Sequence, residues 1–194
     1  MKQSLFALII LLLFSACGGE AKNKKNKIER KYLFGQIKER NYQNQLFNFQ
    51  IAFNSDWEIN SKHLKTKMFG GTILEAKYLN SDLEDYPLRI SIEIEKVNPF
   101  EKPDLFKRAE EEREGYDFLF DDDELDFKPI RTTTIANEEY TLNEVLVIQE
   151  GDTSYVNDYI RLEKGYYLII STSANTPSDK QMEEQLISSI KRLK

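Results

Sequence analysis

The densest group of side chains that could do chemistry in this sequence is a run of carboxylates. The segment 110–126 reads EEEREGYDFLFDDDELD and holds ten carboxylates and one cation, Arg113. Ca²⁺ prefers clustered carboxylates, but an EF-hand loop needs a glycine at its sixth position, and counting from Asp121 places Asp126 there. We therefore interpret the run as a solvated acidic loop after an exposed helix, with an acidic docking surface and a cation site as alternatives. The candidate partner-binding residues are Asp121, Asp122, Asp123, Glu124 and Asp126.

Other catalytic or metal chemistry finds little support. The chain has one histidine, His63, in the basic segment SKHLKTK, and one cysteine, Cys17. A Ser-His-Asp arrangement needs a histidine beside a nucleophile, and zinc sites need several His or Cys ligands. The sequence therefore predicts no catalytic residue, no metal site and no cofactor. A pair of carboxylates in a cleft could still hydrolyse a glycosidic bond. Four tyrosines in the C-terminal half could also line a groove, although aromatic residues at strand spacing are more often core and cross-strand pairs. They are Tyr155, Tyr159, Tyr166 and Tyr167.

The N-terminal residues indicate a secretion signal. Lys2 is followed by an apolar run of ten residues from Leu5 to Phe14. As a helix this run spans about 15 Å, half of the bilayer core, so it fits a signal peptide better than a transmembrane anchor. The small residues Ser15 and Ala16 then precede Cys17.

This arrangement resembles the bacterial lipoprotein signal, although Phe14 stands where that family usually has leucine. The resemblance implies that residues 1–16 are removed and that Cys17 becomes an N-terminus with a diacylglycerol thioether and an acylated amine. The expected location is the cell envelope, lipid-anchored to a membrane. The outer membrane is favoured in a Gram-negative cell, because residue 18 is glycine and not aspartate.

Residues 17–31 are expected to form a flexible tether. GGEAKNKKNKIERK, residues 18–31, holds six cations and two acids and has no apolar periodicity. Its cations could lie near anionic lipid headgroups, where each would contribute roughly 1 kcal/mol of binding free energy. Alternatively, the segment is a plain solvated spacer.

The remaining residues, 32–194, are enough for a single domain with a sizeable core. This body has 20 basic and 31 acidic residues, a net charge of −11. Such a charge argues against nucleic acid as a partner. It also argues that the body itself does not bind a membrane surface and that the tether provides this contact.

Strands are indicated by alternating apolar residues. Phe47, Phe49, Ile51 and Phe53 form one face of a strand over 46–53, and Trp57 after the turn is expected in the core. Further strands are expected at 72–79, 88–95, 128–135, 139–149, 154–163 and 166–173, with a hairpin turn at 150–153. YYLIIS, residues 166–171, is apolar on both faces and predicts a central strand covered on both sides.

Three helices are expected. The first covers 61–68 after the cap Ser61, and the second begins at Pro103 and stops at Gly115. The last begins after the cap Thr176 and runs to the C-terminus, where its basic residues would complement the helix dipole.

About eight strands and three helices, joined mostly by turns, predict an α+β fold with a central antiparallel sheet and helices on both faces. The segments NYQNQLFNFQIAFNSDWEI and DYIRLEKGYYLIISTSANTPSDKQMEEQLISSIKRL resemble the opening and the close of PsbP-like domains. The resemblance implies an α/β/α sandwich that binds other proteins and has no shared active site.

The leading functional hypothesis is therefore a membrane-tethered, non-catalytic binding or assembly module of the envelope. It would dock an envelope protein through a sheet face or the acidic loop. The alternatives are a periplasmic carbohydrate- or peptide-acting enzyme that uses carboxylates, and a solute- or cation-binding lipoprotein that uses residues 117–126.

Overall fold

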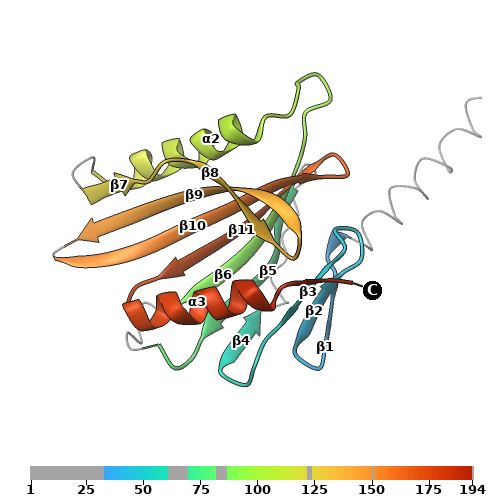
Figure 1. Cartoon of the computed structure of the whole chain (residues 1–194), viewed down its shortest axis with the longest axis horizontal. Helices are drawn as coiled ribbons and strands as arrows, with labels where there is room; N and C mark the ends of the chain where they lie inside the picture. The colour runs from blue at the N-terminus through green and yellow to red at the C-terminus, as the bar shows by residue number, and fades with distance from the viewer. Residues whose placement is uncertain (1–32, 61–69, 82–86, 122–123, 150, 194) are drawn as a thin grey trace, which may run out of the picture.

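The computed structural model of the chain describes residues 33–60, 70–81, 87–121, 124–149 and 151–193, and two antiparallel sheets dominate it (Figure 1). The expected signal segment, tether and helix at 61–68 lie outside these residues. The larger sheet has the spatial order β4 (Trp57–Asn60), β5 (Gly70–Tyr78), β6 (Arg89–Lys96), β11 (Tyr166–Ala174), β10 (Asp152–Glu163), β9 (Glu138–Gln149) and β7 (Leu125–Phe127), and β8 (Arg131–Ile135) also pairs with β9. The smaller sheet has the order β1 (Gln36–Lys38), β2 (Asn41–Asn44), β3 (Phe49–Ala52) and β12 (Lys191–Arg192).

Strand β11 lies in the middle of the larger sheet and is buried on both faces, as predicted. Leu168 and Ile170 have no exposed surface on one face, and Ile169 is 4% exposed on the other. Leu168 and Ile170 belong to the main core together with Trp57, which packs between Phe53 and Tyr78. The tryptophan is therefore a core residue, as expected.

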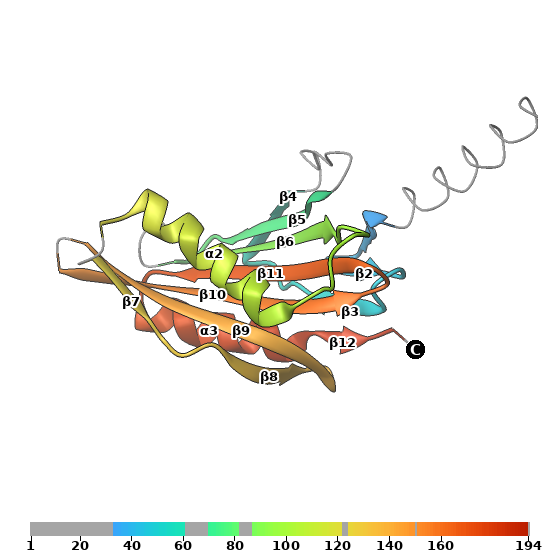
Figure 2. The same cartoon turned by 90° about the horizontal axis from the view of Figure 1, so that it is seen from above.

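The two helices of the described residues, α2 (Leu105–Leu119) and α3 (Pro177–Ser189), contact opposite faces of this sheet (Figure 2). The consecutive β10 residues Asn157 and Asp158 show this, because Asn157 bonds to α3 and Asp158 to α2. The fold is α+β but is dominated by its sheets. Helices were expected to cover both faces of the sheet, but they cover each face only in part. On one face the smaller sheet packs beside α3, and on the other face α2 leaves half of the sheet uncovered.

Helix α2 is longer than its sequence indicated. A stop was expected at Gly115, but the helix continues to Leu119 and ends where Phe120 becomes extended. Glycine in an exposed helix interior costs only about 1 kcal/mol, and contacts of Tyr116, one residue later, hold the last turn on the sheet.

The C-terminal helix is shorter than predicted. Thr176 caps it and Pro177 occupies its first position, as expected, but the helix ends at Ser189. Lys191 and Arg192 instead form β12, which pairs with β3, and Arg192 forms an ion pair with Glu138 at 2.8 Å. The basic residues therefore complete a sheet and do not complement the helix dipole.

The strand expected over 46–53 is shorter, because residues 45–48 form a turn and the strand begins only at Phe49. Strands β2 and β3 form a hairpin in which the Asn44 side chain accepts a hydrogen bond from the Phe47 backbone N–H at 3.1 Å. The apolar face was identified correctly, since all four of its members are at most 5% exposed: Phe47, Phe49, Ile51 and Phe53.

A buried polar network fixes α2 on the sheet. The Asp158 carboxylate accepts hydrogen bonds from the Tyr116 hydroxyl at 3.1 Å and from the Asn143 amide at 3.1 Å. Arg113 donates from Nε to the Asn143 Oδ1 at 2.8 Å and also donates to the Lys128 carbonyl. Burial raises the pKa of Asp158, while these bonds and one from Ser171 lower it. Since Ala109 is the one fully buried residue of α2, the polar bonds set where the helix lies.

A second buried carboxyl group, Glu183, fixes α3. Its Oε1 accepts hydrogen bonds from Thr172 at 2.5 Å and Asn157 at 2.8 Å, and its Oε2 has no hydrogen-bond partner. Burial raises the pKa of this group as well.

The stability of the protein should therefore depend on pH through these groups. Because the folded-state pKa of Asp158 is raised, the folded state holds a proton that the unfolded state loses near pH 4. The resulting stabilisation is complete below about pH 4 and is lost as pH rises through the folded pKa. Asp158→Asn should flatten the pH dependence by up to about 1.4 kcal/mol per pH unit in that window.

Urea unfolding at a series of pH values measures this effect. Asp152→Asn, which removes an exposed carboxylate from the same strand, is the matched control. Identical pH dependence in wild type and Asp158→Asn would contradict the role assigned to this carboxyl group.

Packing of α3 gives a second prediction. Leu186 and Ile190 are 5% and 3% exposed, so replacing either with alanine should cost roughly 2–5 kcal/mol of unfolding free energy. Glu184→Ala, at an exposed position of the same helix, should change it by at most about 0.5 kcal/mol. If denaturant melts show no loss in either core variant, the assigned face of α3 is wrong.

Candidate functional site

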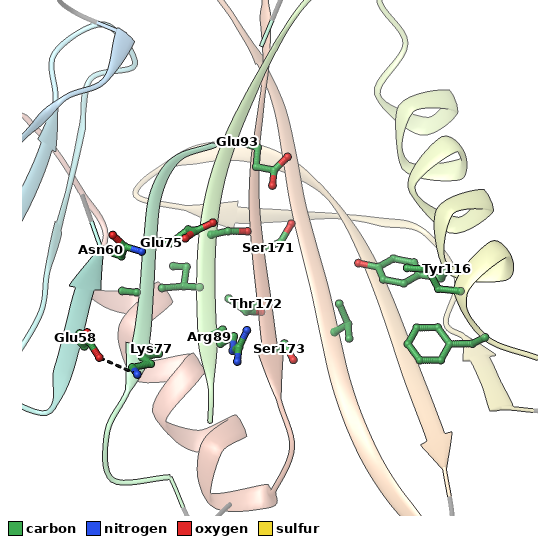
Figure 3. Close-up of a pocket in the computed structure, with 16 residues that line it drawn as sticks. Glu58, Asn60, Glu75, Lys77, Arg89, Glu93, Tyr116, Ser171, Thr172 and Ser173 are labelled. Carbon is green, nitrogen blue, oxygen red and sulfur yellow. Dashed lines mark ion pairs between the residues drawn. The ribbon is translucent and has the colours of Figure 1, made fainter. Parts of the chain in front are cut away.

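The open half of the larger sheet forms a groove of mixed polar and apolar lining beside α2 (Figure 3). Its volume is about 660 Å³. Strands β4, β5, β6 and β11 form the floor, and the last turns of α2 form one wall. We call this the sheet groove. Its polar lining residues include Glu58, Asn60, Glu75, Lys77, Arg89, Ser91, Glu93, Tyr116, Ser171 and Ser173.

Strand register places the floor residues in rows across the sheet. Lys77 pairs in register with Glu58 on β4 and with Arg89 on β6, and Arg89 pairs with Ser173 on β11. The Lys77 ammonium lies 2.8 Å from the Glu58 carboxylate. This row therefore presents one balanced ion pair and the exposed guanidinium of Arg89.

The next row is richer in acceptors and hydroxyls. Glu75 lies between Asn60 and Ser91, and Ser91 pairs in register with Ser171. Ser171 pairs with Asp158, so the buried network of α2 begins directly at the groove floor. Burial and the neighbouring Asp158 carboxyl group raise the pKa of Tyr116, so its hydroxyl stays neutral and can donate a hydrogen bond.

The described lining residues of the groove can recognise a ligand through hydrogen bonds. Among the described residues that line it, the groove has hydroxyls and charges of both signs but neither a histidine nor a cysteine. Within the described ranges, no cluster of three or more His, Cys, Asp or Glu side chains could hold a metal ion. Three carboxylates do line the groove, Glu58, Glu75 and Glu93, so the carboxylate-based alternative keeps a location.

The C-terminal end of α2 is unusually apolar for a surface. Leu119 and Phe120 line the groove wall, and the side chains of Phe118 and Leu119 are 89% and 68% exposed. The exposed acids Asp117 and Asp121 border them. We call Asp117–Asp121 the α2 tip. It is continuous with the groove through Leu119 and Phe120.

The acidic stretch 121–126 is only partly the loop that was predicted. Asp122 and Asp123 lie outside the described residues, and Leu125 and Asp126 begin strand β7, which pairs with β9. Glu124 accepts hydrogen bonds from the Asp121 backbone N–H at 3.2 Å and from Gln149 at 3.2 Å.

Part of this stretch forms a strand and not a solvated loop, because the edge of β9 that faces it has backbone groups available for pairing. Asp126 forms an ion pair with Lys128 at 2.6 Å. Of the described candidate docking residues, Glu124 and Asp126 therefore already have side-chain partners within the protein, whereas Asp121 is exposed.

The four tyrosines considered as groove residues are structural. Tyr155, Tyr159 and Tyr166 pack against the main core, and Tyr167 packs on the second cluster around Ala109. The Tyr159 hydroxyl lies 3.4 Å from the Glu183 carboxylate. The interpretation as core and cross-strand aromatics is confirmed for Tyr155, Tyr159 and Tyr166, whereas Tyr167 also lines a small cavity beside the first turn of α2.

Sequence reasoning missed the groove. Arg89, Ser91 and Glu93 alternate with isoleucines on β6, which was interpreted as a plain solvated face. The available signal was Ser171 and Ser173, two hydroxyls that interrupt the otherwise apolar central strand on the same face. That pattern indicates that part of the covered face is open to solvent.

In the part of the chain that the structure describes, no helix is both long enough and apolar enough to cross a bilayer. Neither a model of a known protein family nor a curated protein sequence matches the chain.

Solved structures do resemble it. Cyanobacterial PsbP (CyanoP) from Synechocystis aligns with a TM-score of 0.57 at 10% identity, over 79% of this chain and 91% of that protein. LpqN of Mycobacterium tuberculosis, described as involved in cell envelope biogenesis, gives a TM-score of 0.47 at 11% identity over 74% of this chain and 82% of that one. The Saccharomyces cerevisiae Ran-binding protein Mog1p gives 0.44 at 10% identity over 78% of this chain and 85% of that one. The likeness to CyanoP shows that the chain has a PsbP-like fold, while the other two are too weak to bear on its function.

Proposed function

We propose that the protein is a membrane-tethered binding module of the bacterial envelope that docks a partner protein without catalysis. The observation that supports this most is the continuity of the sheet groove with the α2 tip. A hydrogen-bonding floor, an apolar edge formed by Phe118 and Leu119, and an acidic border thus form one surface. Exposed apolar residues with a polar rim are the usual composition of a protein-binding site.

The chemistry of this surface specifies its partner. Large aromatic side chains that become buried supply most of the affinity of an interface, and Phe118 is available for that role. The exposed acids Asp117 and Asp121 border it, and Asp122 and Asp123 follow in the sequence. These charges favour a partner with lysine or arginine around an apolar pocket. The wider segment 121–126 contributes less, because Glu124 and Asp126 have partners within the chain.

The anchor belongs to the same proposal. Residues 1–16 would be a signal peptide, Cys17 the lipidated N-terminus, and 17–31 a basic tether that leads to the single domain over 32–194. Several acyl chains, at about 0.8 kcal/mol for each buried CH₂, hold a protein firmly in a bilayer. The sequence Cys17-Gly18 favours the outer membrane where the cell has one.

A carboxylate enzyme is the second candidate. The groove has the size of a small-molecule site, and three carboxylates line it. Glu58 is neutralised by Lys77, which leaves Glu75 and Glu93 for acid–base chemistry. Loss of a measurable hydrolytic activity in Glu75→Gln, with partner binding unchanged, would favour this candidate over the binding module.

The anchor is tested by one substitution. Cys17→Ser should abolish lipidation and shift the protein from the membrane fraction to the soluble fraction or leave its signal peptide uncleaved. Mass spectrometry of the N-terminal peptide and membrane fractionation measure both effects. A membrane-free mature protein with an unmodified Cys17 would exclude the anchor.

The docking surface is tested by photocrosslinking from chosen positions in living cells. A photoreactive phenylalanine analogue at Phe118 should give a discrete adduct with an envelope protein, and the same analogue at Glu184, an exposed residue of α3, should not. Adducts of equal yield from both positions would contradict the assignment of the surface.

Neutralising Asp121, Asp122 and Asp123 to asparagine should slow association with that partner, and added salt should mimic the change. The matched control neutralises three exposed carboxylates elsewhere, Glu39, Glu139 and Glu184. Micromolar calcium binding that the first variant loses would instead favour a cation-binding lipoprotein.

A further inference from the structure

Further exposed aromatic side chains lie near the opposite end of α2 from the tip. Phe100 is 94% exposed in the segment between β6 and α2, and Phe106, in the first turn of α2, is 51% exposed. Lys96 and Lys102 flank Phe100 and are exposed. We call residues 96–102 the Phe100 loop; Figure 1 shows it at the end of α2 remote from β7.

The Phe100 loop is held in one conformation by its own side chains. Asn98 accepts a hydrogen bond from the Phe100 backbone N–H at 3.2 Å, and its amide donates to the Glu101 carboxylate at 3.1 Å. On the helix side, the Asp104 backbone N–H donates to the Tyr167 hydroxyl at 3.2 Å. The loop therefore exposes the phenylalanine as an ordered feature, with its one acid already engaged.

A chain of contacts connects this loop to the place where the tether meets the domain. The first described residue, Leu33, accepts a hydrogen bond through its carbonyl from Asn44 at 2.8 Å. In the following turn, the Leu46 carbonyl accepts from the Lys164 ammonium at 2.6 Å. The neighbouring Gly165 carbonyl accepts from the Val97 N–H at 3.0 Å, which begins the Phe100 loop. The start of the domain, the β10–β11 hairpin and the Phe100 loop thus lie at one end.

We infer that the Phe100 loop is a membrane-contact element that inserts Phe100 into the interface of the bilayer to which the tether is attached. This rests on the proposed lipid anchor at Cys17. A flexible tether of 15 residues, 17–31, has an r.m.s. length of only about 20 Å, so the tethered end of the domain stays near the surface. Aromatic rings favour the headgroup region of a bilayer, and lysines beside them interact with anionic lipids.

The negative charge of the body does not oppose this contact. Charges on a protein surface are screened within about 8–10 Å at physiological salt. The 15 residues of α2 separate the Phe100 loop from the acidic tip by about 22 Å. The net charge of −11 argues against membrane binding by the body itself, but the Phe100 loop carries Lys96 and Lys102 against one acid, Glu101, which gives it a local net charge of +1.

The test uses the lipidated protein, purified from membranes and reconstituted into vesicles of phosphatidylcholine and phosphatidylglycerol with brominated acyl chains. Bromine quenches tryptophan that enters the bilayer. The natural Trp57 is 3% exposed in the core and serves as an unquenched reference. Phe100→Trp adds a reporter at the loop, and Phe118→Trp adds a matched reporter at the other end of α2, where Phe118 is 89% exposed.

We expect quenched, blue-shifted emission from residue 100 and unquenched emission from residue 118. Lys102→Gln in the Phe100→Trp background should weaken the docked state about fivefold, which corresponds to one surface lysine. Unquenched emission from residue 100, or equal quenching at both positions, would overturn the inference. A blue shift at residue 100 that requires an added protein would also overturn it, because the loop would then dock a protein.

Vesicle flotation separates this test from the anchor. Protein that fails to float with the vesicles lacks the lipid, and the proposed function fails with it. Protein that floats but shows no quenching at residue 100 retains its anchor, and only the membrane contact of the loop is excluded.

Discussion

The fold depends on strand β11 being buried on both faces between β6 and β10. Its register with β6 runs from the pair Tyr166–Lys96 to the pair Ser173–Arg89 and joins the first half of the chain to the second. Ile169 and Ile170 point to opposite faces, and both are buried. A slip of one residue would exchange the two faces, placing the hydroxyl of Ser171 in the main core and exposing Ile170 in the groove. The same register therefore fixes the core, the groove floor and the strands on which both helices pack.

Buried polar groups then determine where each helix packs. The neighbouring β10 residues Asn157 and Asp158 form hydrogen bonds with α3 and α2, respectively, on opposite faces of the sheet. Burying Asp158 and Glu183 costs free energy, and their raised pKa values are the sign of that cost. Such groups specify position more than they add stability. For α2 this matters most, because Ala109 is its one fully buried residue, so the remaining faces of the helix are left for solvent and partners.

The elements that the sequence predicted well are those governed by local apolar pattern. The central strand, the buried face from Phe47 to Phe53, the cap Thr176 and the core position of Trp57 all follow from residue type and spacing. The misassigned positions depend on distant partners. Lys191 and Arg192 suit a helix end, yet β3 offers them a free strand edge. Gly115 suits a helix stop, yet Tyr116 finds Asp158 on a strand far away in the sequence.

The candidate site was the least predictable part for the same reason. Arg89 and Ser173 are distant in the chain, and only the β6–β11 register makes them neighbours. The fold is shared with CyanoP at 10% identity. It depends on apolar residues at the buried positions and much less on which residues are exposed. Phe100 and Phe118 contribute little to folding, since they are almost fully exposed. Exposed aromatic residues near both ends of α2, Phe100 before it and Phe118 near its last residue, indicate two contact surfaces. Under the proposed lipid anchor, α2 would act as a spacer of about 22 Å that directs the acidic tip away from the membrane, where a basic partner could reach it without competing with anionic lipid.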